Sequence, residues 1–439
     1  MRNPRLRDPL KRPQFRRLAL SYAVNELGDW MGIVALSVLV YNRTGSALAT
    51  AALFIGTRFL PALIAPILVA RVEQPPPRFA LPVIYCGEAA AFGALALLAG
   101  SDFALAGVIA LAAIDGTLAL AGRALTRAVV AALLEPAGEL RAGNAVLNVA
   151  FTGGAAIGPG VAGLMVAGFG VQSALLLDAV SFYAIAWILL TAGSLPQAEP
   201  DPGLVRDRVR AGLAYIREMP TLRRLLTAQG AAFVFFAAVI PIEVIYAKQT
   251  LDAGDTGYGL LLASWGVGMV VGSIVFAAVR RAPLPVLLFF SSVAVGAGYL
   301  GLAAAPTLLL ACAAAVVGGT GNGVQWVSAV SAVQELTVAG MQARVMSVLE
   351  SVGAAMPGVG YLIGGLVASS ASPRATFLLA GVGILVTVFV AALALGRNWP
   401  ERREKGGTAS FGAVPEIMVE LIPVGGNRLP ARSNSEVVS

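Results

Sequence analysis

The chain has 439 residues, of which 57% are hydrophobic and 13% are charged. Its hydrophobic residues form about a dozen long apolar stretches, and a soluble protein of this length could not bury all of them in its core. The net charge is +7, but the basic residues gather in short gaps between apolar stretches, so they indicate orientation in a membrane rather than a nucleic-acid partner. Histidine is absent and the two cysteines lack metal-ligand spacing, so we expect neither a metal nor a cofactor.

Apolar stretches of about 20 residues predict twelve transmembrane helices, because a helix of that length crosses the hydrocarbon core of a bilayer. The expected fold class is therefore an all-α membrane protein. The predicted spans are 16–41, 47–70, 80–99, 103–126, 144–167, 171–192, 226–247, 258–279, 284–304, 307–330, 346–369 and 374–396.

The distribution of basic residues predicts the topology. The apolar stretch after the basic segment 1–15 is too long for a signal peptide, so it is a first span. Arg58 lies within a span, and only Arg43, Lys248 and Arg374 fall in the gaps that follow odd-numbered spans. Since cytoplasmic loops are enriched in Lys and Arg, we expect a multi-pass cell-membrane protein with both termini in the cytoplasm.

The longest gap, 193–225, divides the spans into two sets of six. It begins as a polar, proline-rich linker and continues over 204–226 as an arginine-rich amphipathic stretch, expected to lie as a helix on the cytoplasmic surface. Short motifs recur in both halves. They are Thr44-Gly45 with Thr256-Gly257, and 154–159 with 353–358. The expected parts are a cytoplasmic segment 1–15, a bundle 16–192, the linker 193–225, a bundle 226–396 and a disordered cytoplasmic tail 397–439.

Four local motifs resemble the major facilitator superfamily, and within it a bacterial drug and siderophore exporter-like branch, over residues 15–396. They are Phe15-Arg16-Arg17-Leu18, Leu27-Gly28-Asp29-Trp30, the run from Tyr41 to Ala49 followed by Arg58-Phe59-Leu60-Pro61, and Gly154-x-x-x-Gly158-Pro159-x-x-x-Gly163. The resemblance implies two pseudo-symmetric six-helix bundles around a central cavity, alternating access, and a bacterial inner-membrane location. The last motif is similar to one associated with proton antiporters.

One departure from the family concerns the loop between spans 2 and 3. Members usually carry an Asp-Arg pair there, which locks one conformation. If Arg71 takes the basic position, Ala70 replaces the carboxylate, so the lock is weakened or rebuilt through Glu73. This departure leaves open a non-transporting member of the family.

Charged residues inside spans are costly in lipid, so they are usually paired or functional. Asp29 and Arg58 lie near the middle of spans 1 and 2. They form either a site that binds a proton or a cationic substrate, or a fixed ion pair that orders the bundle. Glu26 lies three residues before Asp29 and so shares its helix face. Two carboxylates that face one cavity would favour proton binding by one of them.

Other interior charges have competing interpretations. Asp115 in span 4 is a second proton-site candidate or a hydrogen-bonded structural residue. Glu243 follows Pro241 in span 7, where it either meets substrate or caps the outer mouth. Glu88 and Asp178 lie on spans that usually pack outside the cavity, so we interpret both as structural. Arg123 and Arg127 lie at the predicted cytoplasmic end of span 4. We interpret their side chains as extending toward the membrane interface rather than as binding residues.

Span 5 carries the gating and packing candidates Gly154, Gly158, Pro159 and Gly163. Glycines let helices touch, and a proline inside a helix removes a backbone donor and bends it. These residues therefore either seal a bendable contact between the halves or provide the generic packing of membrane helices. The motif GxGxxG at 158–163 lies inside an apolar span and follows no strand, so it does not indicate a dinucleotide site.

We therefore expect a monomeric secondary transporter, not an enzyme, that exports a small hydrophobic or amphiphilic compound in exchange for protons. No P-loop motif is present, which argues against ATP as the energy source. The alternatives are an uptake or lipid-flipping transporter, or a membrane sensor or scaffold derived from a transporter.

Overall fold

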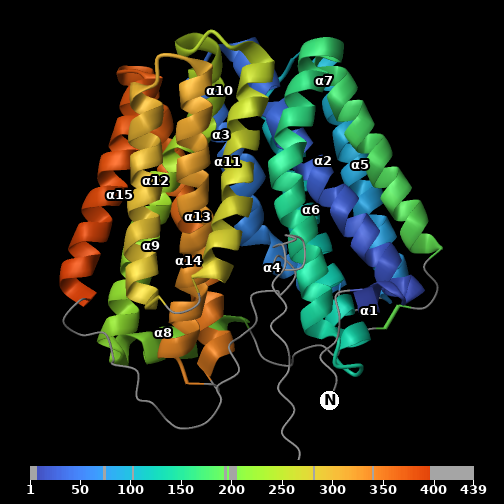
Figure 1. Cartoon of the computed structure of the whole chain (residues 1–439). Coiled ribbons are helices and arrows are strands. Elements are labelled where there is room, and N and C mark those ends of the chain that lie inside the picture. Colours follow the sequence, from blue (N-terminus) through green and yellow to red (C-terminus); the bar gives the residue numbers. More distant parts are fainter. Residues whose placement is uncertain are drawn as a thin grey trace, which may run out of the picture.

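The computed structural model describes residues 7–72, 76–100, 103–191, 195–196, 205–279, 282–338 and 341–395, and these residues form helices without a strand. Eleven of the helices are long and apolar enough to cross a membrane. One of them, Ala142–Leu190, is broken at Gly170, whose φ of 80° and ψ of 164° are not helical. The chain reverses at this glycine (Figure 1), so this helix crosses twice and the predicted twelve crossings are confirmed.

The first bundle is formed by the helices up to residue 190. Its crossings are irregular in two places. The helix α7 contains both the fifth and the sixth crossing, and the π-helical segment η1 interrupts the second crossing. In chain order the elements are α1 (Arg7–Leu10), α2 (Pro13–Thr44), α3 (Ala47–Phe54), η1 (Ile55–Phe59), α4 (Leu60–Val72), α5 (Pro77–Gly100), α6 (Leu105–Leu134) and α7 (Leu140–Leu190).

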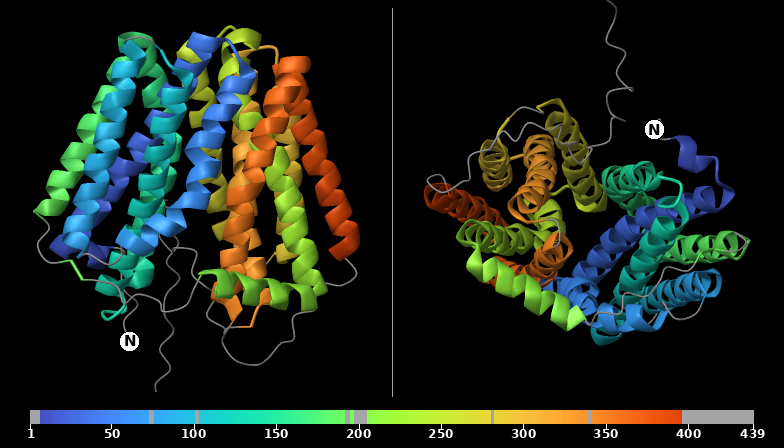
Figure 2. Two further views of the ribbon diagram at one scale, coloured as in Figure 1. Left: turned by 180° about the vertical axis from the view of Figure 1, so that it is seen from behind. Right: turned by 90° about the horizontal axis from the view of Figure 1, so that it is seen from below.

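The second bundle stands beside the first, and α8 lies across one of its ends (Figures 1 and 2). Its seventh crossing is irregular, with a 3-10 turn η2 and a π-helical segment η3 on either side of the short helix α10. The elements are α8 (Val205–Glu218), α9 (Pro220–Val239), η2 (Ile240–Ile242), α10 (Glu243–Ile245), η3 (Tyr246–Thr250), α11 (Gly254–Ala278), α12 (Leu284–Ala304), α13 (Leu308–Leu336), α14 (Gln342–Ser370) and α15 (Pro373–Leu395).

The amphipathic stretch is shorter than the single helix expected over 204–226. Its helix α8 ends at Glu218, and Met219 is extended because it precedes Pro220. Pro220 then occupies the first position of α9, where a missing N–H does no harm. Ile216 of α8 packs with Leu222 and Val345 in a small apolar cluster, which fixes α8 against the ends of α9 and α14.

The turns between crossings use left-handed residues. Gly45 ends α2 with a φ of 60° and donates its N–H to the carbonyl of Tyr41. In the second half the left-handed positions are Asp252 and Gly254, whereas Gly257 lies inside α11. The resemblance between Thr44-Gly45 and Thr256-Gly257 therefore does not extend to a shared turn.

We name the two ends of the molecule by their residues. The α8 end carries α8 and α1, and the Lys248 end carries the turn at Gly45 and the segment η3. The two bundles lie closer together at the Lys248 end and spread apart toward the α8 end (Figure 1). This asymmetry decides which contacts between the bundles are closed in this conformation.

Candidate functional site

An ion-pair cluster lies inside the first bundle, between α2 and α6. Arg123 Nη1 donates to Asp29 Oδ2 at 2.8 Å and lies 3.8 Å from Glu26 Oε1. The amide of Asn25 also donates to Asp29 Oδ2 at 3.3 Å. The side chains of Glu26, Asp29 and Arg123 are only 1%, 12% and 20% exposed. Because Glu26 and Asp29 are three residues apart on α2, one guanidinium reaches both.

This cluster corrects the expectation for Arg123. The sequence favoured an extended side chain at the membrane interface, but α6 continues beyond the predicted end of span 4 to Leu134. Arg123 therefore lies inside the helix and serves as the partner of two carboxylates. The geometry leaves the alternatives for Asp29 and Glu26 open, since a fixed ion pair and an exchangeable proton site share this arrangement.

Arg58 is not the partner of Asp29. It lies in η1 and is exposed, and within the part of the chain that the structure describes its side chain makes no ion pair or hydrogen bond. The expected pairing of Arg58 with Asp29 is therefore absent from this conformation, and Arg123 takes that place.

Three further carboxylates are buried in the first bundle. Glu88 is 0% exposed, Asp178 is 2% exposed and Asp115 is 9% exposed. Among the described residues, neither oxygen of Glu88 has a hydrogen-bond partner, and one oxygen each of Asp115 and Asp178 lacks one. Unpartnered buried oxygens are rare in folded proteins, so these three carboxyl groups stand out within the first bundle.

Asp178 explains one glycine of α2 and contributes to a second. A methyl group on Gly28 would meet the Asp178 carboxylate first, at 3.3 Å from Cγ. A methyl group on Gly32, four residues later on the same face, would meet the Phe92 ring first, at 2.6 Å, and Asp178 Oδ2 at 3.0 Å. Ser181 donates to Asp178 Oδ1 at 3.2 Å and orients the carboxyl group. Gly28, quoted above as part of a family motif, thus makes room for a carboxylate.

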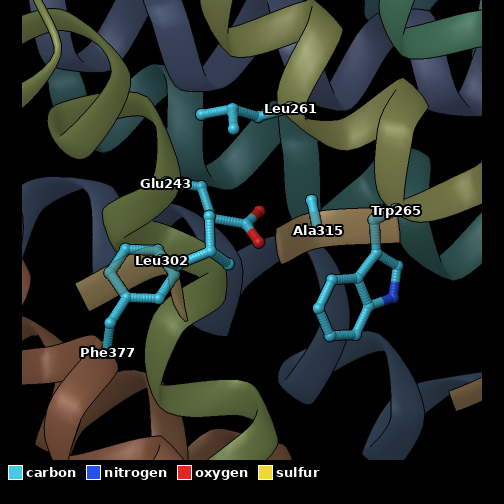
Figure 3. A pocket seen from close by; sticks show the side chains of 6 residues that line it. All are labelled: Glu243, Leu261, Trp265, Leu302, Ala315 and Phe377. Atoms are coloured by element: carbon cyan, nitrogen blue, oxygen red, sulfur yellow. The ribbon is translucent and has the colours of Figure 1, made fainter. Parts of the chain in front are cut away.

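Glu243 has a different environment. It lies on α10 and lines a cavity of about 10 Å³, close to the smallest volume that holds one water molecule. The other lining residues are apolar or aromatic: Leu261, Trp265, Leu302, Ala315 and Phe377. Figure 3 shows the carboxylate directed into the space between these side chains. The ring of Trp265 stacks on Tyr299 at 5.1 Å, which closes the aromatic wall behind the cavity.

The span 5 glycines divide into two groups. Added methyl groups on Gly154 and Gly158 would meet α2 of the same bundle, at 3.1 Å from the Glu26 carbonyl carbon and 2.7 Å from Trp30 Cβ. Gly163 instead faces the second bundle, where a methyl group would lie 2.9 Å from the Asp255 carbonyl oxygen and 3.0 Å from Gly259 Cα.

Pro159 joins the same contact between bundles, because a methyl group on Gly259 would meet its carbonyl oxygen. Across the molecule, α14 meets α3 in a similar way. A methyl group on Gly365 would lie 2.9 Å from Ala51 Cβ and 3.5 Å from the Ala47 carbonyl oxygen. Both contacts lie toward the Lys248 end.

A polar contact that the sequence analysis did not predict joins the bundles at this end. Lys248 Nζ donates to Asn42 Oδ1 of the first bundle at 2.6 Å and to Asp255 Oδ1 of its own bundle at 2.5 Å. Asn42 ends the first crossing and Lys248 ends the seventh, which are equivalent positions in a duplicated fold. That equivalence is the signal from which this contact could have been found.

The departure from the family's loop motif is only partly visible. Arg71 belongs to α4, but the positions of its side chain and of the Ala70 side chain are not described, and Glu73 lies outside the described residues. Groups of three or more metal-ligating side chains do not occur among the described residues.

Comparison with protein families places most of the chain in one family model. Residues 7–412 match the model described as "Transmembrane secretion effector". The chain is 28% identical over 386 residues to the multidrug efflux pump Tap of Mycolicibacterium fortuitum, covering 83% of this chain and 91% of that protein. It is 27% identical over 394 residues to the pump of that name from Mycobacterium tuberculosis H37Rv, covering 83% and 89%.

Solved transporter structures share the fold. A POT family transporter in complex with 5-aminolevulinic acid superposes with a TM-score of 0.71 at 12% identity, over 87% of this chain and 96% of the other. A variant of the nucleoside transporter NupG superposes with a TM-score of 0.70 at 12% identity, over 87% and 99%. Identities this low establish the arrangement of the helices and nothing about substrate.

Proposed function

The chain belongs to the transmembrane secretion effector family of the major facilitator superfamily, and from this premise we propose that it exports a small hydrophobic or amphiphilic compound in exchange for protons. Residues 7–412 match the family model, and its relatives are named multidrug efflux pumps. In this proposal the two bundles rock about a site near the bilayer midplane and open it to one side at a time.

The observation that carries the proton coupling is the cluster of two carboxylates on one guanidinium. Arg123 needs only one carboxylate to balance its charge, so the second can bind a proton without leaving the guanidinium unpaired. We assign this role to Asp29, which is the more accessible of the two, with Glu26 as the buried partner. Asp115 and Glu243 are further proton or substrate candidates.

The contacts between the bundles support a seal at one end. Gly163 and Pro159 approach α11, while Gly365 approaches α3, and Lys248 bridges to Asn42. We propose that the α8 end is cytoplasmic, with both termini on that side, so this conformation is closed to the outside. In this scheme Gly154 and Gly158 hold α7 against α2 so that the first bundle moves as one body.

The proposed domain bounds remain those of the sequence: 1–15, 16–192, 193–225, 226–396 and 397–439. The whole tail lies outside the described residues, as do residues 193–194 and 197–204 of the linker. We propose that Arg71 retains a gating role at the end of α4, where the family's loop motif begins.

A transport assay tests the coupling. Purified protein is reconstituted into liposomes loaded with rhodamine 123, and efflux of the dye is followed with and without an imposed pH gradient. We expect the gradient to accelerate efflux, and Asp29→Asn to remove most of that acceleration, because an amide cannot bind and release the coupled proton. The matched control is Glu135→Gln, an exposed carboxylate at the end of α6, which should leave the acceleration unchanged.

Other outcomes identify the other functions. Dye movement that ignores the gradient and survives in Asp29→Asn contradicts proton antiport. Gradient-driven accumulation inside right-side-out vesicles indicates uptake, and movement of labelled lipid indicates flipping. Absence of movement of every solute, together with a phenotype in the deletion strain, favours a sensor or scaffold.

A further inference from the structure

We propose that Arg58 binds an anionic group of the transported compound, so that the exporter accepts amphiphilic anions such as carboxylates, sulfonates or phosphates. This inference rests on the proposed export function and names a substrate class for it. Four observations support this assignment. Arg58 has no partner among the described residues, lies between the bundles, belongs to the π-helical segment η1 and has aromatic side chains nearby.

Arg58 is the unpaired member of a contrasting pair of arginines. Arg123 holds two carboxylates, at 2.8 Å and 3.8 Å, whereas Arg58 holds none among the described residues. A guanidinium carries five donors in a planar fork and stays ionised at every physiological pH. Arg58 is exposed and has no partner among the described residues, so it is open to a ligand that brings its own negative charge.

Groups from both bundles lie near Arg58. Its electrostatic neighbours come from three elements: Glu26 on α2, Asp115 on α6 and Tyr361 on α14. The last of these belongs to the other bundle. The next residue, Phe59, also touches that bundle, since a methyl group on Gly358 would lie 2.6 Å from Phe59 Cδ2. Arg58 thus lies at the seam between the bundles, where a compound in transit would pass.

The local backbone presents Arg58 at this seam. Ile55–Phe59 is π-helical, while the residues on both sides are α-helical. A single π turn inserts an extra residue into a helix and rotates the following side chains, and such turns occur frequently at functional sites. Here the turn places an arginine within a crossing where charge in lipid would cost about 2.5–3.5 kcal/mol or more.

The surroundings of Arg58 suit an amphiphile rather than a simple ion. Aromatic rings lie along the seam between the bundles. The ring centroids of Phe54 and Tyr361 are 5.6 Å apart, and Phe59 packs beside Gly358. An acidic group of the compound would pair with the guanidinium in a bidentate geometry, while its apolar body contacts these rings. Glu26 and Asp29 do not compete for Arg58 in this conformation because Arg123 already holds them.

Binding of two matched dyes tests this proposal. Fluorescein and rhodamine 123 share the xanthene ring system but carry opposite charge, and binding of each dye to purified protein in detergent is followed by its change of fluorescence anisotropy. We expect Arg58→Gln to weaken fluorescein binding at least about tenfold, since a charge-assisted hydrogen bond is lost. Rhodamine 123 should bind as before or more tightly. Arg58→Lys should fall between, because lysine keeps the charge and loses the fork.

The matched control is Arg210→Gln, which removes an exposed arginine on α8 and should leave the affinities for both dyes unchanged. Thermal unfolding of each variant shows that it is folded, and Arg58→Lys carries the test if Arg58→Gln does not fold. The proposal is overturned if the wild type does not bind fluorescein, or if Arg58→Gln weakens both dyes by the same factor. Failure of the export function is seen separately, as dye efflux that ignores the pH gradient.

Discussion

The two bundles share a fold but handle charge in opposite ways. In the first bundle five carboxylates lie in the interior, and one arginine holds two of them. In the second bundle, among the side chains that the structure describes, Glu243 is the carboxylate placed in mid-crossing, and its cavity is otherwise apolar and aromatic. The two bundles therefore differ in the chemistry of their interiors. The first bundle is suited to charge transfer, and the second to contact with apolar groups.

Two single glycines illustrate a related contrast. In the first bundle, Gly28 makes room for the carboxylate of Asp178. In the second bundle, Gly268 lets backbones touch: a methyl group on it would lie 2.8 Å from Thr320 N and 3.0 Å from the carbonyl carbon of Gly319. Gly28 thus accommodates a polar group, and Gly268 brings helices together. Substitutions at Arg123, at Gly28 and Gly268, and at Glu243 test this contrast, in order of decreasing expected effect.

The largest effect is expected at Arg123. Arg123→Gln leaves Glu26 buried without its counter-charge, and breaking a buried pair in this way costs about 3–5 kcal/mol. We expect a large fall in the melting temperature in detergent, measured by fluorescence-detected gel filtration, and loss of gradient-driven efflux. The triple variant that adds Glu26→Gln and Asp29→Asn should recover most of the melting temperature. If Arg123→Gln melts like the wild type, the cluster does not stabilise the first bundle.

A smaller effect is expected at two glycines, Gly28 in the first bundle and Gly268 in the second. Gly28→Ala and Gly268→Ala should each cost about 1–3 kcal/mol by overpacking. The two should differ in rescue. Asp178→Ala removes the group that meets Gly28 and should restore the melting temperature of Gly28→Ala. The alanine at 268 meets backbone, so Thr320→Ala should not restore that variant. Rescue of both, or of neither, would contradict the proposed division of roles.

The smallest effect on stability is expected at Glu243. Glu243→Gln keeps the size of a side chain whose described neighbours in the cavity are apolar and aromatic, so the melting temperature should change by the equivalent of less than about 1 kcal/mol. Glu26→Gln is the comparison in the first bundle, and it should lower the melting temperature more because it removes a buried carboxylate that lies 3.8 Å from the Arg123 guanidinium. If Glu243→Gln instead abolishes gradient-driven efflux of rhodamine 123, proton coupling extends into the second bundle and the division is incomplete.

Much of the fold could be predicted because it depends on local properties of the chain. The length of each apolar stretch determines whether it crosses, and the asymmetry of basic residues suggested an even number of crossings. The interior carboxylates were visible for the same reason, since charge within an apolar stretch is conspicuous. The end of α8 at Glu218 and the position of the turn at Gly254 were missed, because helix ends depend on single residues such as Pro220.

The order of amino acids is enough to specify a helical protein that crosses the membrane many times and carries charge in its interior. Which of those charges meet depends on the tertiary structure. Arg123 rather than Arg58 pairs with Asp29, Asp178 sits over Gly28, and Lys248 reaches Asn42 across the two bundles. The reason is geometric. Pairing depends on how each helix is rotated about its axis and how far it is shifted along it, and neighbours distant in the chain set both.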